Sequence, residues 1–415
     1  MRIASTLILP LCLSMFCCLQ SACSQVSDPI TVTEEGLLED LIFLKEKILK
    51  THPNPFYLTT KEEFNSKIQH LLNNKGRYEA EEIYVRMLEI VASVGDGHTN
   101  LRPFEYYNDY PLRFYWLQDN IYISGISKDQ KTLLGSKLVA VDGIPIEDVM
   151  SKVFNLIPGH ESKTFSRDWA TYYVRIAEIM YGLGICSSKK SIVYKIETPS
   201  GEHIELPFKI EPANGEIEIV RPYEKAPMYY DEKENGLWFR ELDHNLIYFH
   251  FSDYPRKSEF KKLGKNLNKL LGKSVDKTLL IDLRRNGGGD FTKGRKLIEL
   301  IEKTVIKNKI PVYVAIGGST YSAAVANAVD FKKRLNATLL GEVTAGRPNG
   351  YQENNAFVLP NTKIPGSCSS EYYKFQEEDT PGLFPDVEIK FMWEHYAKSQ
   401  DVVLDYLYGE LERFE

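Results

Sequence analysis

The sequence predicts an α/β fold with a parallel sheet, and three observations lead to this fold class. Apolar runs that fit buried strands occur three times in the C-terminal half, at residues 278–283, 311–316 and 337–340. Two segments that fit helices lie between them, at 292–307 and 323–334. Glycines separate each strand from the helix that follows. The order β-α-β-α-β predicts parallel strands joined by right-handed crossovers.

Length and composition agree with a globular protein of several domains. The chain has 415 residues, enough for two or three domains, and 43% of its residues are hydrophobic. Its formal net charge is −6, and no basic stripe runs along it. We therefore predict no nucleic-acid partner.

A triple glycine and a serine should meet at one edge of this sheet. Residues 286–289, Asn-Gly-Gly-Gly, end the first strand, and Ser322 opens the helix after the second. Parallel strands share a carboxyl edge, where open α/β sheets bind their ligands. Backbone N–H groups at a helix start favour developing negative charge. Gly288 or Gly289, together with Ala323, could therefore supply the two N–H donors of an oxyanion hole.

Ser322 also has structural interpretations. A serine that begins a helix is most often an N-cap. A strand-glycine-helix unit could be a nucleotide loop, but the dinucleotide pattern G-x-G-x-x-G and the P-loop pattern are both missing. The G-x-S-x-G motif of α/β-hydrolases is missing as well, because Thr320 and Ala324 stand at its glycine positions.

His98 is the candidate partner of the serine. It lies in the segment Gly95-Asp96-Gly97-His98-Thr99, which closes a helical pattern at 80–94. The two glycines would let the backbone approach another group closely. A neutral imidazole near a serine can act as its general base, whereas a capping or hydrogen-bonded structural histidine is the alternative. No metal-binding pattern is present, and we predict neither a metal nor a cofactor.

The remaining chain predicts further elements. We expect helices at 34–50, 61–73, 80–94 and 145–153, and strands at 121–126, 137–141, 191–197, 203–208 and 246–251. Aromatic residues gather in one segment, where they could line a peptide groove or pack in a core: Phe104, Tyr106, Tyr107, Tyr110, Phe114, Tyr115 and Trp116.

The N-terminus predicts export. Residues 1–22 have a short positive start and an apolar stretch of signal-peptide length. The end of this stretch, LQSAC, resembles a bacterial lipoprotein signal with Cys23 as the lipidated residue, followed by a tether at 23–33. A secretory signal cleaved near Ala22 is the alternative. Outside this leader only Cys186 and Cys368 remain, and these two could form a disulfide.

Six motifs in order resemble one family. They are GDGHT, LVAVDGIPIEDV, LIDLRRNGGGD, TYSAA, LLGEVTAG and LFPDVEI, and together they extend over roughly residues 30–410. This set is similar to the tail-specific, or C-terminal-processing, serine peptidases, with their tricorn-core and retinoid-binding-repeat branch. The resemblance implies a helical N-terminal domain (34–103), a PDZ-like β-rich insertion (104–230) and a crotonase-like (ClpP/crotonase) catalytic domain (231–415).

The resemblance also implies roles for single residues. Ser322 matches the nucleophile, and Gly288, Gly289 and Ala323 match the oxyanion hole. The processing peptidases use a lysine as base, but the matching segment here carries Arg347, which cannot lose its proton at ordinary pH. His98 instead matches the histidine base of the tricorn branch. An acidic residue near the final Pro-Asp motif assists it there, and of the three candidates Glu377, Glu378 and Asp379 we take Asp379.

These inferences lead to one leading function and two alternatives. The leading function is an exported serine endopeptidase that hydrolyses peptide bonds in peptide or protein substrates, anchored to a bacterial membrane through Cys23 and facing the periplasm or the cell surface. A catalytically inactive lipoprotein that binds peptides or lipophilic molecules is the first alternative. An esterase with the same machinery is the second. The sequence leaves the oligomeric state undetermined.

Overall fold

The structure is a computed structural model that describes residues 32–102, 110–159, 161–209, 218–230, 236–273 and 276–413. Its C-terminal half is built on a six-stranded sheet with the order β18-β13-β12-β11-β10-β9. Strands β18 to β10 run parallel to their neighbours, and β9 is antiparallel to β10. In that order they span Val387–Glu388, Thr338–Gly341, Val312–Ile316, Thr278–Asp282, Leu246–Phe251 and Leu237–Glu241.

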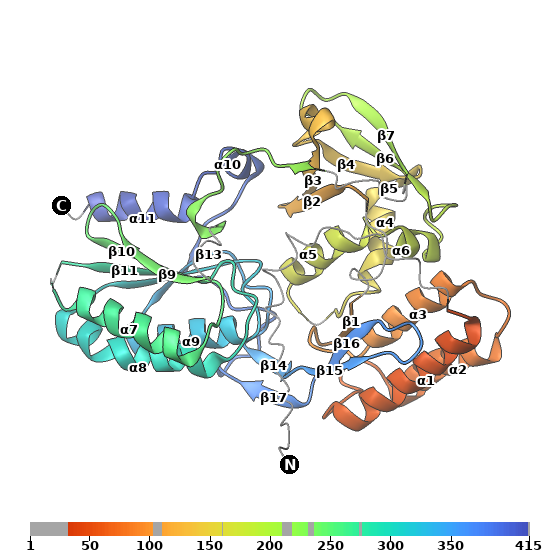
Figure 1. Ribbon diagram of the computed structural model, residues 1–415, viewed down its shortest axis with the longest axis horizontal. Coiled ribbons are helices and arrows are strands. Elements are labelled where there is room, and N and C mark those ends of the chain that lie inside the picture. Colours follow the sequence, from red (N-terminus) through yellow and green to blue (C-terminus); the bar gives the residue numbers. More distant parts are fainter. Residues whose placement is uncertain are drawn as a thin grey trace, which may run out of the picture.

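Helices cover both faces of this sheet. On one face lie α7 (Lys257–Leu271), α8 (Phe291–Asn308) and α9 (Ala323–Leu335), and on the other lies α11 (Val402–Glu412) (Figure 1). Side chains of β10 alternate between the two apolar clusters, as expected for a strand buried on both faces. The predicted β-α-β-α-β order and the parallel pairing are confirmed by β11, α8, β12, α9 and β13.

The N-terminal half begins with three helices, as predicted. They are α1 (Glu34–Thr51), α2 (Lys61–Asn73) and α3 (Ala80–Ala92), and the hydroxyls of Thr33 and Thr60 cap the first two. The strand after them, β1 (Asn100–Leu101), pairs with β16 (Pro365–Cys368), which also pairs with β15 (Asn355–Val358). A hairpin from the C-terminal half therefore joins the N-terminal helices (Figure 1).

A second, antiparallel sheet follows, with the order β2-β3-β4-β6-β7 and with β5 and β8 at its side. Its predicted strands at 121–126, 137–141, 191–197 and 203–208 are confirmed. In chain order, β2 to β8 span Leu112–Leu117, Asn120–Ser127, Lys137–Val141, Ile144–Pro145, Ser191–Glu197, His203–Lys209 and Ile219–Val220.

Three helices accompany this sheet, and only the first was predicted. They are α4 (Ile146–Phe154), α5 (Lys163–Tyr173) and α6 (Ala177–Gly182). The last two share an apolar core with α1 to α3 and with Tyr321. Short elements complete the fold: β14 (Asn349–Gln352), β17 (Glu371–Lys374), α10 (Trp393–Ala397), and 3₁₀ helices at Lys128–Leu133 and Met228–Tyr230.

Several predicted features lie outside the described residues. These are the signal peptide, Cys23, nearly all of the tether, and the aromatic residues Phe104, Tyr106 and Tyr107. In the part of the chain that is described, Cys186 and Cys368 are buried free thiols, so the disulfide considered above is not formed. Within the same residues, no helix combines the length and apolarity needed to span a bilayer, and no cluster of three His, Cys, Asp or Glu side chains could hold a metal.

Candidate active site

Ser322 occupies a strained turn between β12 and α9. Its backbone angles are φ 52° and ψ −121°, a combination that residues other than glycine rarely adopt. The loop before it is fixed by Thr320, whose hydroxyl donates to the Leu283 carbonyl (2.8 Å) and accepts from the Gly317 amide (3.0 Å). Ser322 occupies the N-cap position of α9, as the structural interpretation expected, but its side chain makes no capping hydrogen bond to the helix.

Two glycines leave space for this turn. A Cβ atom on Gly288 would lie 2.7 Å from the Ser322 Cβ, and one on Gly346 would lie 3.0 Å from the Ser322 backbone nitrogen. Both distances are too short for a side chain. Gly288 also has a φ of +106°, which favours glycine. The glycine turn after β11 and the loop after β13 therefore pack directly against the serine.

The imidazole of His98 reaches this serine from the other half of the molecule. Its Nε2 lies 2.9 Å from the Ser322 Oγ, although 224 positions separate the two residues in the chain. His98 is buried, with 4% of its surface exposed. The structure thus brings together the two residues that the sequence singled out, at hydrogen-bond distance.

One buried carboxylate shapes the histidine loop. Oδ1 of Asp96 accepts hydrogen bonds from the backbone amides of His98 (3.0 Å) and Thr99 (2.9 Å) and from the hydroxyl of Ser369 (2.5 Å). Oδ2 lies 2.8 Å from Nε2 of His52. Because Nδ1 of His52 accepts the Asn54 amide, its proton sits on Nε2 and is donated to Asp96.

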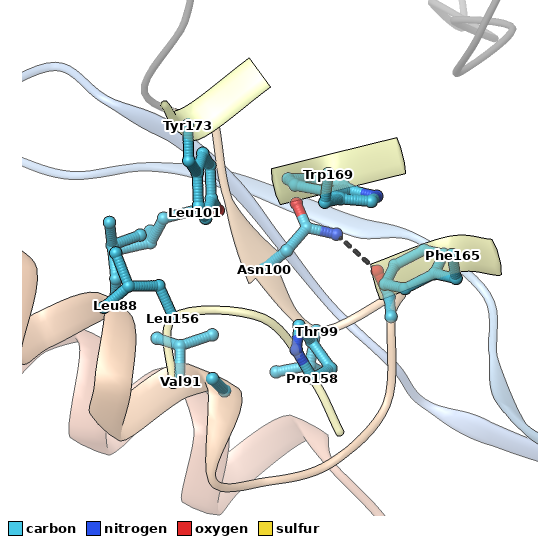
Figure 2. Close-up of a pocket in the computed structure, with 12 residues that line it drawn as sticks. Leu88, Val91, Thr99, Asn100, Leu101, Leu156, Pro158, Phe165, Trp169 and Tyr173 are labelled. Carbon is cyan, nitrogen blue, oxygen red and sulfur yellow. Dashed lines mark hydrogen bonds between the residues drawn. The ribbon is translucent and has the colours of Figure 1, made fainter. Parts of the chain in front are cut away.

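A largely apolar cavity lies behind the histidine loop. It is small, with a volume of about 10 Å³, and Figure 2 shows Phe165 and Trp169 of α5 on one side of it and Leu88 and Val91 of α3 on another. Asn100 of β1 stands among them and donates from Nδ2 to the Gly97 carbonyl, at 2.7 Å. The backbone of the histidine loop is thereby held on this side as well.

Tyr321 supports the histidine, a role that our sequence reasoning missed. Its hydroxyl lies 3.1 Å from Nδ1 of His98, and its ring stacks on the imidazole with centroids 4.8 Å apart. On its other side the ring stacks on Phe165, at 5.4 Å. A Cβ on Gly97 would collide with the Tyr321 hydroxyl, which explains the glycine before His98. The one indication of this role in the sequence was that Tyr321 directly precedes Ser322.

The acidic residues expected to support the histidine lie elsewhere. Asp379 forms an ion pair with Arg347 (Oδ1 to Nη2, 2.5 Å), and 54% of its side chain is exposed. Glu377 pairs with Lys374 at the surface, while the Glu378 carbonyl accepts from Asn349. Among the described residues, the His98 side chain hydrogen-bonds to Ser322 and Tyr321. The structure therefore places Asp379 away from the position at His98 that the sequence assigned to it.

Of the two glycine amides considered for the oxyanion hole, one is engaged elsewhere. The Gly288 amide donates to Oδ1 of Asn286 at 3.0 Å and is thus engaged within its own turn. The amides of Gly289 and Ala323 donate to no other residue in the described chain, so they are the two candidate donors for an oxyanion.

Asn286 joins the glycine turn to the serine turn. It is fully buried, and its carbonyl accepts the Tyr321 amide at 3.0 Å. Its Nδ2 donates to the Phe251 carbonyl at 2.9 Å. From the sequence, Asn286 could be recognised only as the first residue of the turn.

Burial sets the protonation states of the central groups. It lowers the pKa of His98 from 6.5 to about 4, against the opposing effect of the Asp96 charge. The imidazole is therefore neutral at neutral pH and can accept a proton. Burial, together with the charge of Glu161, raises the pKa of Tyr321 well above its usual range, so its hydroxyl keeps its proton.

Comparison with solved structures shows the fold. Mature CPAF superposes with a TM-score of 0.59 at 14% identity, over 91% of this chain and 96% of CPAF. Mature CPAF complexed with lactacystin superposes with a TM-score of 0.58 at 15% identity, over 92% of this chain and 98% of that one. The tricorn protease gives only 0.43 at 14% identity, over 91% of this chain and 37% of its own, which is too low to support an argument. This chain therefore has the fold of CPAF.

Comparisons by sequence add nothing to this result. No protein-family model matches the chain, and no curated protein matches it. Since the structural similarity holds at 15% identity or less, it establishes the fold and leaves the chemistry to be argued from the residues themselves.

Proposed function

We propose that this protein is a serine peptidase of the tail-specific, or C-terminal-processing, type. The contact of 2.9 Å between His98 Nε2 and Ser322 Oγ carries the proposal. A serine hydroxyl becomes nucleophilic when an adjacent neutral base can take its proton, and His98 is neutral at neutral pH. The strained backbone of Ser322 supports the same function, because such strain is concentrated at active sites.

The proposed reaction follows the geometry. Ser322 Oγ attacks the carbonyl carbon of the scissile peptide bond while its proton moves to Nε2 of His98. The carbonyl oxygen becomes an oxyanion, which the amides of Gly289 and Ala323 stabilise. When this intermediate collapses, the C–N bond breaks and His98 returns the proton to the leaving amine. Water then releases the acyl group from Ser322 by the same steps, with His98 again as base and acid.

A non-catalytic binding protein remains the alternative on this fold. It would have no use for a serine held at φ 52° and aligned with a neutral imidazole, since a strained residue costs about 1–3 kcal/mol of stability. An esterase would use the same groups and differs only in the bond cleaved. We therefore take peptide-bond hydrolysis as the function to test first.

We also propose the finer domain assignment and the export of the protein. The α/β half at 231–415 would be the crotonase-like domain, residues 104–230 the PDZ-like insertion, and 34–103 the helical cap. The antiparallel sheet with α4 supports the second assignment, and helices α1 to α3 support the third. Export rests on the leader at 1–22 and on Cys23 as lipid anchor. A Cys23→Ser variant should move from the membrane to the soluble fraction, and an unchanged membrane fraction would contradict the anchor.

Hydrolysis of fluorescently labelled casein tests the enzyme assignment. Wild-type protein should release peptides, and Ser322→Ala should lower the rate by several orders of magnitude, to the background of the assay. Ser319→Ala, three residues away in the same loop, is the matched control and should retain the wild-type rate. Both variants should show the wild-type circular dichroism spectrum. Undiminished hydrolysis by Ser322→Ala would overturn the assignment.

A further inference from the structure

The carboxylate of a catalytic triad is missing from the place where the sequence puts it. In the productive tautomer, Nε2 of His98 accepts the serine proton, so Nδ1 carries a hydrogen that needs an acceptor. That acceptor is the hydroxyl of Tyr321, at 3.1 Å. A neutral hydroxyl alone stabilises an imidazolium only weakly, which raises the question of what lies behind it.

Glu161 lies behind the tyrosine. We propose that Tyr321 and Glu161 together replace the acidic member of the triad, the tyrosine hydroxyl accepting from Nδ1 of His98 and donating to the Glu161 carboxylate. Both are positioning residues that act through His98. This inference rests on the proposed function and specifies which residues support its base.

The contacts of Glu161 fit this role. Its Oε1 accepts the amide of Gly97, the residue before His98, at 3.0 Å. Its Oε2 is buried and has no hydrogen-bond partner in the described chain, so an acceptor remains for the tyrosine hydroxyl. The charge of Glu161 acts on that hydroxyl directly, since it is a cause of the raised pKa of Tyr321 after burial itself. A buried carboxylate oxygen needs a donor, and the hydroxyl of Tyr321 is the donor that the proposal assigns to it.

The surrounding chain holds Glu161 in place. The next residue, Ser162, caps α5 through the Phe165 amide and donates its hydroxyl to the Ala345 carbonyl, at 3.0 Å. This bond ties the start of α5 to the loop that carries Gly346 and packs against Ser322. Phe165, one turn into α5, stacks on the Tyr321 ring. One helix start therefore fixes both the carboxylate and the tyrosine.

Arg347 interacts with both candidate acids, Asp379 and Glu161, but in different ways. Its guanidinium binds Asp379, whereas its charge and its backbone amide both stabilise the ionised form of Glu161. Asp379 is thus used as a counter-ion for Arg347, on the exposed side of that side chain. Glu161 is half-buried, lines a small cavity together with Arg347 and accepts the Gly97 amide.

The proposed arrangement moves only one proton. When Ser322 gives its proton to Nε2, His98 becomes an imidazolium whose Nδ1 hydrogen stays bonded to Tyr321. Tyr321 keeps its own proton, because its pKa is raised by burial and by Glu161. The negative charge of Glu161, passed on through the polarised hydroxyl, balances the charge of the imidazolium.

Glu161 should make the reaction depend on pH. Burial raises its pKa to about 7, with Asp96 raising it further and Arg347 and the Gly97 amide opposing. Asp96, Arg347 and Tyr321 interact electrostatically with Glu161, and Tyr57, Tyr351 and Tyr372 line the same small cavity. Above this pKa the carboxylate is ionised and stabilises the imidazolium, and below it the protonated acid does not. The nucleophilicity of Ser322 should therefore rise through about pH 7.

The rate of reaction with a fluorophosphonate probe tests this, because it needs no knowledge of the natural substrate. We would measure the second-order rate constant between pH 4 and 9 for wild type, Glu161→Gln, Tyr321→Phe, the double variant and Asp379→Asn. Glu299→Gln, an exposed glutamate on α8, is the matched control. We expect Glu161→Gln and Tyr321→Phe each to react at least about tenfold more slowly at pH 8 and to lose the rise near pH 7.

The variants also distinguish a positioning role from a loss of structure. Because the two residues act as one unit, the double variant should be no slower than the slower single variant. Tyr321→Phe keeps the stacked ring and provides the test if Glu161→Gln does not fold. Asp379→Asn should retain the rise in labelling rate near pH 7. The midpoint of that rise can shift, because this variant removes a charge near Arg347.

Each outcome separates this inference from the proposed function. Wild-type rates with an intact rise near pH 7 in both Glu161→Gln and Tyr321→Phe would overturn the inference, while labelling of Ser322 would leave the peptidase assignment standing. Loss of the rise in Asp379→Asn alone would return the role to Asp379. A wild-type protein that neither reacts with the probe nor hydrolyses casein would overturn the proposed function and the inference with it.

Discussion

The serine turn and the histidine loop form one candidate site but are held by different physical means. Ser322 is fixed by backbone conformation and close packing, with a φ of 52° and with Gly288 and Gly346 in contact with it. His98 is fixed by hydrogen bonds, since Asp96 holds the backbone of its loop from within. Both halves need glycine at a close contact, Gly288 beside Ser322 and Gly97 beside His98, but only the histidine half also depends on a buried charge.

This difference has a consequence for mutations. A methyl group added at Gly288 should damage the serine side, where there is no space. Removing the charge of Asp96 should damage the histidine side, where both carboxylate oxygens of Asp96 accept hydrogen bonds. The following variants test that contrast.

Gly288→Ala should have the largest effect. Its Cβ would lie 2.7 Å from the Ser322 Cβ and 3.0 Å from the Tyr321 carbonyl oxygen, at a φ of +106°. Displacement of the serine and of the adjacent oxyanion donors should lower casein hydrolysis by about 10²–10³-fold. Gly201→Ala is the control, since it has a φ of +86° but no atom within 4 Å. Equal activity in the two variants would show that close packing at Gly288 is unimportant.

Asp96→Asn should lower stability more than any exposed Asp→Asn change. In one orientation, the new NH₂ group would face the Nε2 hydrogen of His52, which also donates. In the other, it would face the backbone amides of His98 and Thr99, which would then lose their acceptor. We expect a loss of about 1–3 kcal/mol in the free energy of unfolding at pH 7, measured by urea titration. Asp119→Asn, whose side chain is 93% exposed, should change it by less than about 0.5 kcal/mol.

The same variant has a predictable pH dependence. Burial alone would raise the pKa of Asp96, but the hydrogen bonds from His52 and Ser369 oppose it, and the pKa is lowered. A lowered pKa stabilises the folded protein above the unfolded value of about 3.9, and this contribution is lost as the pH falls through the folded pKa. The difference between wild type and Asp96→Asn should therefore shrink below about pH 4. A difference that grows with acidity would contradict this assignment.

Glu161→Gln should expose the titration of His98 itself. Without the titration of Glu161, the fluorophosphonate rate should fall only once on acidification, with a midpoint of about 4. If His98 were exposed, the midpoint of this fall in rate would lie at about pH 6.5. A midpoint near 6.5 would show that the imidazole is not buried as the structure has it, and it would weaken the role of the packed histidine loop.

Arg347→Met should have the smallest effect. Its positive charge lowers the pKa of Glu161, so its removal should move the rise near neutrality to higher pH and leave the rate at pH 9 close to that of wild type. Arg413→Met, at an exposed C-terminal position, is the control and should not shift the profile. A shift to lower pH in Arg347→Met would contradict the arrangement around Glu161.

The sequence was sufficient for the parts of the site that depend on local order. A strand that ends in glycine beside a strand that ends in serine places Gly289 and Ser322 at one sheet edge through topology alone. His98 could be singled out because the two glycines before it, Gly95 and Gly97, imply a close approach of the backbone to another group. The strained φ of Ser322 and the engaged amide of Gly288 required the backbone coordinates.

The support of the histidine could not be predicted, because it depends on packing between distant segments. Glu161 precedes a helix that the sequence analysis missed, and nothing near it in the chain points to His98. Asp379 matched the position expected from the resemblance, but the sequence does not show that Arg347 binds it first. Tyr321 was within reach, since it adjoins Ser322, yet its hydroxyl is identified as a partner only when the loop at 95–99 packs against it.

The most direct test of the account is to identify the residue that reacts with a fluorophosphonate, by mass spectrometry of the digested protein. We predict a single adduct on Ser322 in wild type, formed at least about 10³-fold more slowly in His98→Ala. An adduct on another residue, or equal rates of Ser322 labelling in wild type and His98→Ala, would contradict the claim that Ser322 is a nucleophile activated by His98.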